Sequence, residues 1–107
     1  NRRALENVEL TAQIPGISFA EWGQGDMHMS FGYKKAHQEP RPPEVQEARD
    51  RVFLACKKAG LRFLEGFTAE TCAQKIDEGT RICGVENADG ERIASVGRAY
   101  TKRTMPV

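Results

Sequence analysis

The stretch FAEWGQGDMHMSFG (Phe19–Gly32) joins a short apolar and aromatic run to a glycine-rich corner that carries one carboxylate. The run from Ile17 to Trp22 is long enough for one buried strand. Gly23 and Gly25 then precede Asp26, and glycine allows a ligand to approach the main chain closely. The stretch therefore predicts a strand that ends in a ligand-binding loop, from Gly23 to Asp26.

Helix and strand signals alternate along the rest of the chain. The clearest helix is predicted over 44–59, after Pro42-Pro43 and before Gly60, because proline suits a helix start and glycine a helix end. Residues 33–43 are polar and rich in proline, which is typical of a loop. The other expected elements are helices over 4–13 and 69–78 (with Thr68 as its N-cap and Gly79 as its stop), a helical or irregular segment over about 92–102, strands over 61–65 and 80–85, and a turn over 87–90.

This order of elements predicts an α/β fold. Strands that alternate with helices pair in parallel through right-handed crossovers. An open sheet of three parallel strands would leave both edges and one face unprotected. Three strands in 107 residues instead match about half of an eight-stranded barrel of about 250 residues. We therefore expect residues 1–107 to form a single, partial barrel domain.

Composition limits the classes of function. With 39% hydrophobic residues, 29% charged residues and a net charge of +1, the chain has no strong electrostatic attraction to nucleic acid or to membranes. No apolar run approaches the roughly 18 residues that span a bilayer, and no signal peptide is predicted. Cys56, Cys72 and Cys83 form no C-x-x-C pair, which favours reduced thiols in the cytoplasm over a disulfide frame or a zinc site.

Asp26 has two interpretations from residue chemistry alone. Its carboxylate is a hard oxygen ligand for Mg²⁺ or Mn²⁺, and successive loop N–H groups suit a bound anion. Aspartate is also a favoured N-cap, so Asp26 could simply cap a helix that starts at Met27. A dinucleotide motif, G-x-G-x-x-G, is excluded because its third glycine would fall on His28.

Several motifs together point to one family. Pro43-Glu44-Val45-Gln46 and Ala59-Gly60 bracket the long predicted helix, and Ala4–Asn7 precedes the first strand. Pro15-Gly16, Gly23, Asp26, Ser30 and Gly32 fall without a gap on the pattern PGVDxxxxGPxDLSxSLG. In these motifs the chain, over about residues 1–85, resembles the metal-dependent (class II) pyruvate aldolases of the HpcH/HpaI aldolase/citrate lyase family.

The resemblance implies the C-terminal half of a TIM-type (β/α)8 barrel and a lyase that converts a 4-hydroxy-2-oxo acid reversibly to pyruvate and an aldehyde. A divalent metal (Mg²⁺ or Mn²⁺, with Co²⁺ as a further candidate) would be held by Asp26 and by a glutamate just before Asn1. The Gly25 and Asp26 amides would hold the pyruvate carboxylate, while Gly23 and Gln24 would shape the loop. No catalytic residue is expected in this segment, because the family's base histidine and its arginine belong to the first half of the barrel. The 107 residues alone should therefore be inactive.

Departures from the family pattern leave the aldehyde unspecified. Gln24 replaces a proline, His28 replaces a serine, and Arg62, Phe63 and Glu65 stand where the family carries small residues. Two alternatives stay open. One is a citramalyl- or malyl-type CoA-ester lyase, which needs a basic groove for the nucleotide that the sequence does not show. The other is a non-catalytic half-barrel fragment that supplies an oligomer interface.

The remaining candidate residues are expected to have structural or solvent-exposed roles. Trp22 either lines the site or packs in the core. His28 is expected at the surface or beside the site, His37 in water, Glu65 and Glu86 exposed at strand ends, and Met27 and Met29 in packing.

The chain alone is predicted to form a homo-oligomer or to pair with its missing N-terminal half-barrel, because open sheet edges present unpaired N–H and C=O groups. Light scattering should give a mass above 11.9 kDa. Recovery of aldolase activity on mixing with a separately expressed N-terminal half would support the half-barrel. A monomer of 11.9 kDa that unfolds cooperatively would contradict it.

Overall fold

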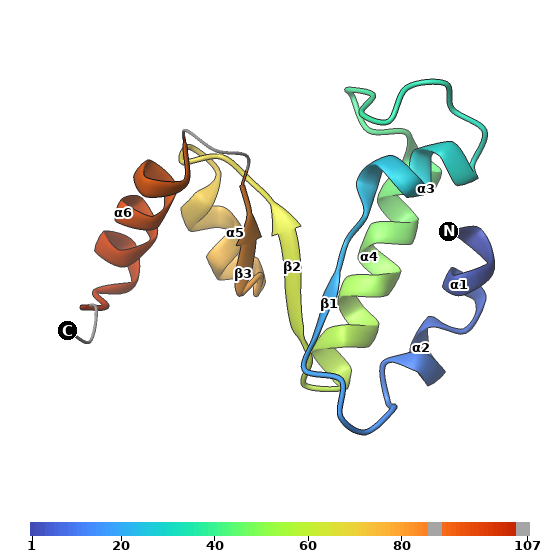
Figure 1. Cartoon of the computed structure of the whole chain (residues 1–107), viewed down its shortest axis with the longest axis horizontal. Coiled ribbons are helices and arrows are strands. Elements are labelled where there is room, and N and C mark those ends of the chain that lie inside the picture. Colours follow the sequence, from blue (N-terminus) through green and yellow to red (C-terminus); the bar gives the residue numbers. More distant parts are fainter. Residues whose placement is uncertain (86–88, 105–107) are drawn as a thin grey trace. The chain divides into compact units, whose positions relative to one another are not determined.

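The structure is a computed structural model that describes residues 1–85 and 89–104 (Figure 1). The chain divides into two compact units, Asn1–Phe63 and Leu64–Val107. The first unit contains α1 (Arg2–Glu6), α2 (Val8–Thr11), β1 (Phe19–Glu21), α3 (Gln24–Ser30) and α4 (Pro43–Lys58). Strand β2 (Arg62–Gly66) begins at the boundary, and α5 (Cys72–Glu78), β3 (Ile82–Gly84) and α6 (Gly90–Thr101) follow it.

The strands form one sheet in the order β1-β2-β3. Strands β2 and β3 run parallel, with Leu64 opposite Ile82 and Gly66 opposite Gly84. The three predicted strands are present at the expected places, although β1 and β3 are shorter than predicted. A parallel sheet interleaved with helices confirms the α/β class and is compatible with part of a barrel.

Helix α4 has the boundaries that the sequence predicts to within one residue. Pro42 is its N-cap and Pro43 its first residue, where a missing N–H costs nothing. Gly60 ends it with a left-handed φ of 72°, and its N–H donates to the carbonyl of Lys57 at 3.2 Å. The next N–H, that of Leu61, donates to the carbonyl of Cys56 at 2.9 Å. These two bonds satisfy helix-end carbonyls in the Schellman arrangement.

The core of the first unit forms on the apolar stripe of α4. Val45 is fully buried there, and Phe63 at the start of β2 is only 1% exposed. The guanidinium of Arg49, itself buried, stacks over the rings of Phe53 at 4.7 Å and Phe63 at 5.4 Å. Because the stripe needs a partner surface, α4 packs against α2 and α3 and against Trp22, which follows β1. The buried cluster comprises Trp22, Met27, Val45, Ala48, Cys56 and Phe63.

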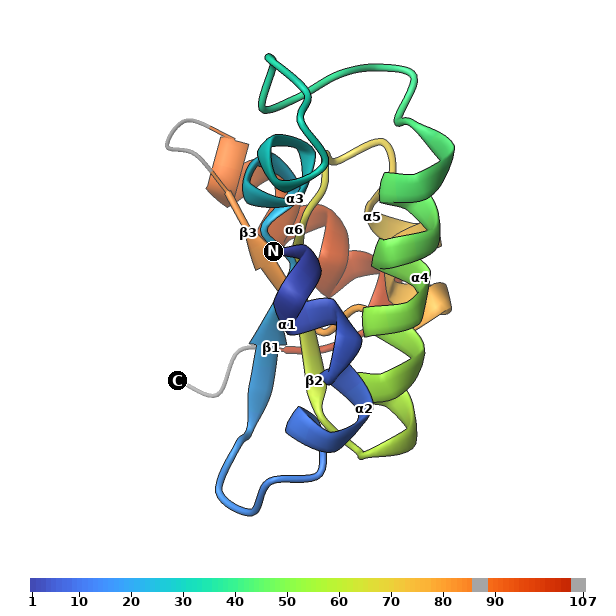
Figure 2. The same ribbon diagram turned by 90° about the vertical axis from the view of Figure 1, so that its right-hand side faces the viewer.

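The second unit pairs α5 with α6 (Figure 2). Cys72 is buried between them, since its Sγ lies 4.0 Å from the carbonyl oxygen of Ile93. Gly79 ends α5 with a φ of 120°, as predicted. The predicted N-cap is wrong: Thr71 holds that position, and Thr68 instead forms a turn with Thr71, whose hydroxyl accepts from the Thr68 N–H at 3.1 Å.

Other predicted boundaries also differ from the structure. The helix expected over 4–13 is two short helices, because Asn7 lies between them with non-helical backbone angles. Helix α6 starts at Gly90, two residues earlier than predicted. The turn predicted over 87–90 lies partly, and Glu86 wholly, outside the described residues. Within 1–85 and 89–104, no helix is long and apolar enough to cross a membrane.

Gly60 provides a test of the α4 ending. A Cβ at this position would meet nothing within 4 Å, so substitution costs only the left-handed backbone conformation. Gly60→Ala should lower the free energy of unfolding by about 1–2 kcal/mol, and Gly60→Asn by less, because asparagine tolerates this conformation. Urea titrations followed by circular dichroism measure both values. Equal losses of unfolding free energy in the two variants would contradict a left-handed backbone at Gly60.

Candidate functional site

The glycine-rich corner is the start of a helix and not an open loop. Strand β1 ends at Glu21, Gly23 is the N-cap of α3, and Asp26 is the third residue of that helix (Figure 1). The predicted loop from Gly23 to Asp26 is therefore wrong for its last three residues. The cap interpretation of Asp26 is also wrong, because the helix starts at Gln24 and not at Met27.

The direction of the Asp26 side chain follows from its neighbours. Met27 is 5% exposed and His28 is fully buried, whereas Asp26 is exposed. Successive residues of a helix point about 100° apart, so burial of the two following side chains turns Asp26 toward solvent. A carboxylate in the first turn of a helix also interacts favourably with the helix dipole.

Gly23 leaves room for the Asp26 carboxylate rather than supplying special backbone angles. Its φ of −84° suits any residue, but a methyl group on Gly23 would lie 3.2 Å from Oδ2 of Asp26. The carboxylate of Asp26 therefore folds back over the helix N-cap. A side chain at position 23 would push this carboxylate away.

A cavity of about 280 Å³ lies beside this carboxylate in the first unit. It contains a second carboxylate, that of Glu21, which the sequence analysis did not single out. The sequence offers one indication of Glu21: it is the last residue of a strand that leads into the glycine-rich corner. None of the residues that line this cavity has a positively charged side chain. The lining residues are Asn1, Ala4, Leu5, Val8, Thr11, Glu21, Trp22, Gly23, Asp26, Met27 and Val52.

Trp22 both packs in the core and lines this cavity. It is 6% exposed, and its indole N–H has no acceptor within the described part of the chain. A buried donor without an acceptor is costly, so such groups usually indicate a missing partner. The predicted core position of Trp22 is therefore confirmed, and Trp22 also borders the cavity beside Asp26.

Two hydrogen bonds to Gln24 stabilise the first turn of α3. The Nδ1–H of His28 donates to the carbonyl oxygen of Gln24 at 2.8 Å, which places this ring inside the unit. The prediction of a surface position for His28 is therefore wrong, because the chain turns back at Gly32 and covers the ring with Tyr33. The side chain of Gln24 accepts from Arg41 at 2.8 Å, which ties the helix start to the loop before α4.

Tyr33 connects the end of this segment to α4. Its hydroxyl donates to Oε1 of Glu44. This hydrogen bond raises the pKa of Tyr33 and lowers the pKa of Glu44, because the bond stabilises the protonated phenol and the ionised carboxyl. Tyr33 therefore joins the segment after α3 to the start of α4.

The other predicted candidates lie away from this corner. His37 is exposed, as expected, whereas Met29 is 57% exposed and does not pack as predicted. Glu65 is 3% exposed and accepts from Nζ of Lys75 at 3.2 Å, so the expectation of an exposed strand-end carboxylate is wrong. The ion pair with α5 removes Glu65 from solvent. Cys56, Cys72 and Cys83 are free thiols.

Metal-ligating residues do not converge at the corner in sufficient number for a complete site. Within residues 1–85 and 89–104, no group of three or more His, Cys, Asp or Glu side chains is placed to hold a metal ion. Asp26 with Glu21 supplies two carboxylates at one cavity. Oxygen ligands of this type suit Mg²⁺ and Mn²⁺.

Parallel strands interleaved with helices define an α/β protein, and the carboxylate cavity lies after the carboxyl end of β1, where α/β folds of this kind hold their ligands. The chain belongs to the HpcH/HpaI aldolase/citrate lyase family, whose sequence model matches residues 1–93. The family consists of lyases, so the chain is of the aldolase/citrate lyase type. No curated protein and no solved structure matches it.

The Tyr33–Glu44 bond has a measurable consequence. Because the pKa of Glu44 is lowered in the folded state, the stability from this bond is present above the ordinary glutamate pKa and is lost as pH falls through the lowered value. Tyr33→Phe should return the Glu44 pKa toward 4.5 and weaken this acid dependence. Carboxyl NMR titration checks both. An unchanged Glu44 pKa in the variant would contradict the bond.

Proposed function

We propose that the chain is the C-terminal part of a metal-dependent pyruvate aldolase with a TIM-type (β/α)8 barrel. The reaction would cleave a 4-hydroxy-2-oxo acid reversibly to pyruvate and an aldehyde. The observation that carries the proposal is the exposed Asp26 carboxylate, folded over Gly23 at the carboxyl end of β1 and open to a cavity. The family match to residues 1–93 supports the lyase class.

The charge of the cavity supports a cation. Asp26 and Glu21 both line it, and no lysine, arginine or histidine does. Two carboxylates at one cavity repel each other, and a divalent ion such as Mg²⁺, Mn²⁺ or Co²⁺ would offset this repulsion. Asp26 would be the ligand from this chain. When bound, the metal would act as a Lewis acid that polarises the 2-oxo group.

A further ligand would come from the segment before Asn1. Asn1 lines the same cavity as Asp26, so a glutamate one or two residues upstream would lie beside the same carboxylate. This placement suits the family's pair of one glutamate and one aspartate.

The start of α3 would position the substrate. The first N–H groups of a helix have no acceptor within the helix, so those of Gly25 and Asp26 are free to donate to the carboxylate of a 2-oxo acid. Gly25 also allows close packing, since a methyl group there would lie 3.2 Å from Cβ of Ala36. Gln24, held by Arg41, would shape this turn.

The composition of the cavity favours a small 2-oxo acid over a CoA ester. A nucleotide carries several phosphates, which bind best beside arginine or lysine. The cavity at Asp26 is lined by acidic, neutral polar and apolar side chains and by no arginine or lysine. The CoA-ester lyase alternative therefore has less support here. The family resemblance further suggests that the protein is an oligomer, and its free cysteines suggest that it resides in the cytoplasm.

Asp26→Asn is the most direct substitution test, made in the protein encoded by the whole gene. It keeps the shape of the side chain but removes the charge that would hold the metal. Pyruvate release in the presence of Mg²⁺ or Mn²⁺ should fall at least about 10²-fold, because loss of a metal ligand affects binding and chemistry together. A coupled assay for pyruvate measures this rate.

Glu47→Gln is the matched control, because Glu47 is an exposed carboxylate on α4 outside the cavity. It should leave the rate within about twofold. The thermal midpoint of Asp26→Asn should change little, since an exposed first-turn carboxylate contributes about 0.3–1 kcal/mol. Unchanged pyruvate release by folded Asp26→Asn would refute the metal-ligand role.

A further inference from the structure

The second unit contains a separate cavity of about 530 Å³. It lies where α5 and α6 pack together, next to the residues that enter β3. Its volume is in the range of small-molecule sites. The lining is Ile76, Thr80, Arg81, Ala94, Gly97, Arg98, Thr101 and Arg103, all of them from this unit.

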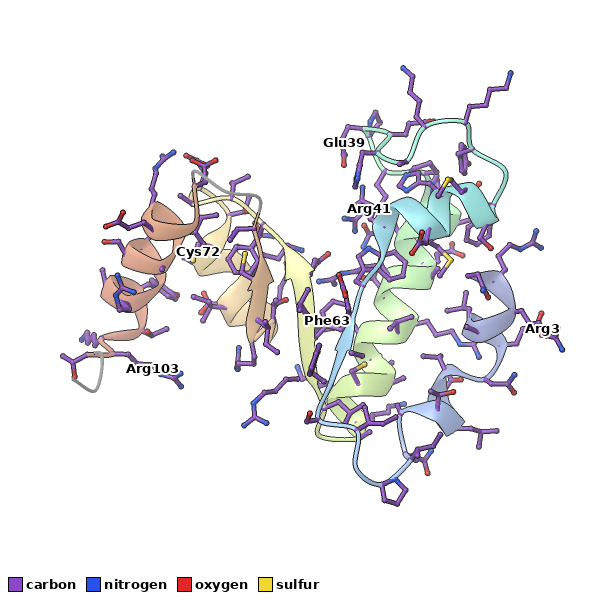
Figure 3. The ribbon with its side chains drawn as sticks, in the orientation of Figure 1. Arg3, Glu39, Arg41, Phe63, Cys72 and Arg103 are labelled. Atoms are coloured by element: carbon purple, nitrogen blue, oxygen red, sulfur yellow. The ribbon has the colours of Figure 1, made fainter. Side chains whose placement is uncertain are left out.

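The charge of this cavity is wholly positive. Three of its lining residues are arginines, and none is acidic. Nη1 of Arg81 donates to the carbonyl oxygens of Ile76 at 2.8 Å and Thr80 at 3.1 Å, so this guanidinium is held in place. In the part of the chain that the structure describes, the side chains of Arg98 and Arg103 have no hydrogen-bond or ion-pair partner. Figure 3 labels Arg103 in the segment that follows α6.

Thr80 is an independent indication of a ligand. Its side chain belongs to the lining yet is only 1% exposed, and its hydroxyl has no hydrogen-bond partner among the described residues. A valine would fill the same space without the cost of an unsatisfied hydroxyl. A polar group kept buried without a partner, beside three cations, suits a ligand that brings acceptor oxygens.

We propose that this cavity is a binding site for a small organic oxyanion, carrying phosphate or several carboxylate groups. Arginine forks bind the oxygens of either group in pairs, and the Thr80 hydroxyl would donate to one more oxygen. Ile76, Ala94 and Gly97 provide an apolar wall for the carbon part of the ligand. The site is separate from the proposed aldolase site and does not depend on it.

A purely structural role explains only part of the arrangement. Cations near helix C-termini offset the helix dipole, which accounts for Arg81 after α5 and for Arg98 in the last turn of α6. It accounts equally for Arg103, which lies two residues after the end of α6. It does not account for the Thr80 hydroxyl, which is buried without a partner among the described residues. Ligand binding accounts for all of them.

Calorimetric titration of the chain with sodium pyrophosphate and, separately, with citrate tests the proposal. At least one of the two should bind saturably with one site per chain; pyrophosphate alone would indicate a phosphate ligand and citrate alone a carboxylate ligand. Arg98→Gln should weaken binding about tenfold, as expected for the loss of a charged hydrogen bond. Arg92→Gln, on α6 but outside the cavity, should weaken it less than about twofold.

Thr80→Val separates binding from folding. Its melting temperature should equal or exceed that of the unchanged chain, because the unsatisfied hydroxyl is removed, while its affinity for the bound probe should fall about threefold or more. Circular dichroism establishes that each variant is folded. Absence of saturable binding for both probes would overturn the proposal. Equal losses for Arg98→Gln and Arg92→Gln would do so as well, because they would indicate general charge attraction.

Discussion

The burial of Trp22 and Met27 against α4 is the constraint on which the corner after β1 depends. Both belong to the cluster around the fully buried Val45. Burying a side chain of this size stabilises a fold by about 1.5–3 kcal/mol, so neither residue can leave the core cheaply. Gly23 and Asp26 lie between these two anchors in the sequence. The carboxylate therefore reaches solvent without contributing to the core.

Sequence patterns predicted the elements better than they predicted the corner. The α4 boundaries were predictable because proline, an apolar stripe and Gly60 all agreed. The start of α3 was not, because Gly23 and Gly25 have low helix propensity, whereas the burial of Met27 and His28 that favours the helix depends on the fold. A surface position was one of two expectations for His28 and the expectation for Glu65, because polarity favours exposure, whereas Tyr33 packs against His28 and Lys75 pairs with Glu65 in the fold.

The family motif predicted a ligand role for Asp26, whereas the cavity beside it could be recognised only in the structure. Glu21 was missed because a single strand-end glutamate carries no spacing signal, and Asn1 became informative only through its place in the same lining. The arginine-lined cavity of the second unit could not be predicted from the sequence either. Arg81, Arg98 and Arg103 are spread over more than twenty positions, and the α5–α6 pairing brings them to one cavity. The charged side chains that line the cavity beside α3 are thus all acidic, and those that line the cavity beside α6 are all basic.

The central claim is that the corner formed by Gly23 and Asp26 holds a divalent metal. Paramagnetic broadening by Mn²⁺, observed in NMR spectra of the ¹⁵N-labelled protein encoded by the whole gene, tests this claim without any substitution. The amide signals of Gly23, Gly25 and Asp26 should broaden at the lowest Mn²⁺ concentrations, before those around other exposed carboxylates such as Asp77. Broadening that begins at Asp77, or that spreads evenly over all exposed carboxylates, would contradict the claim.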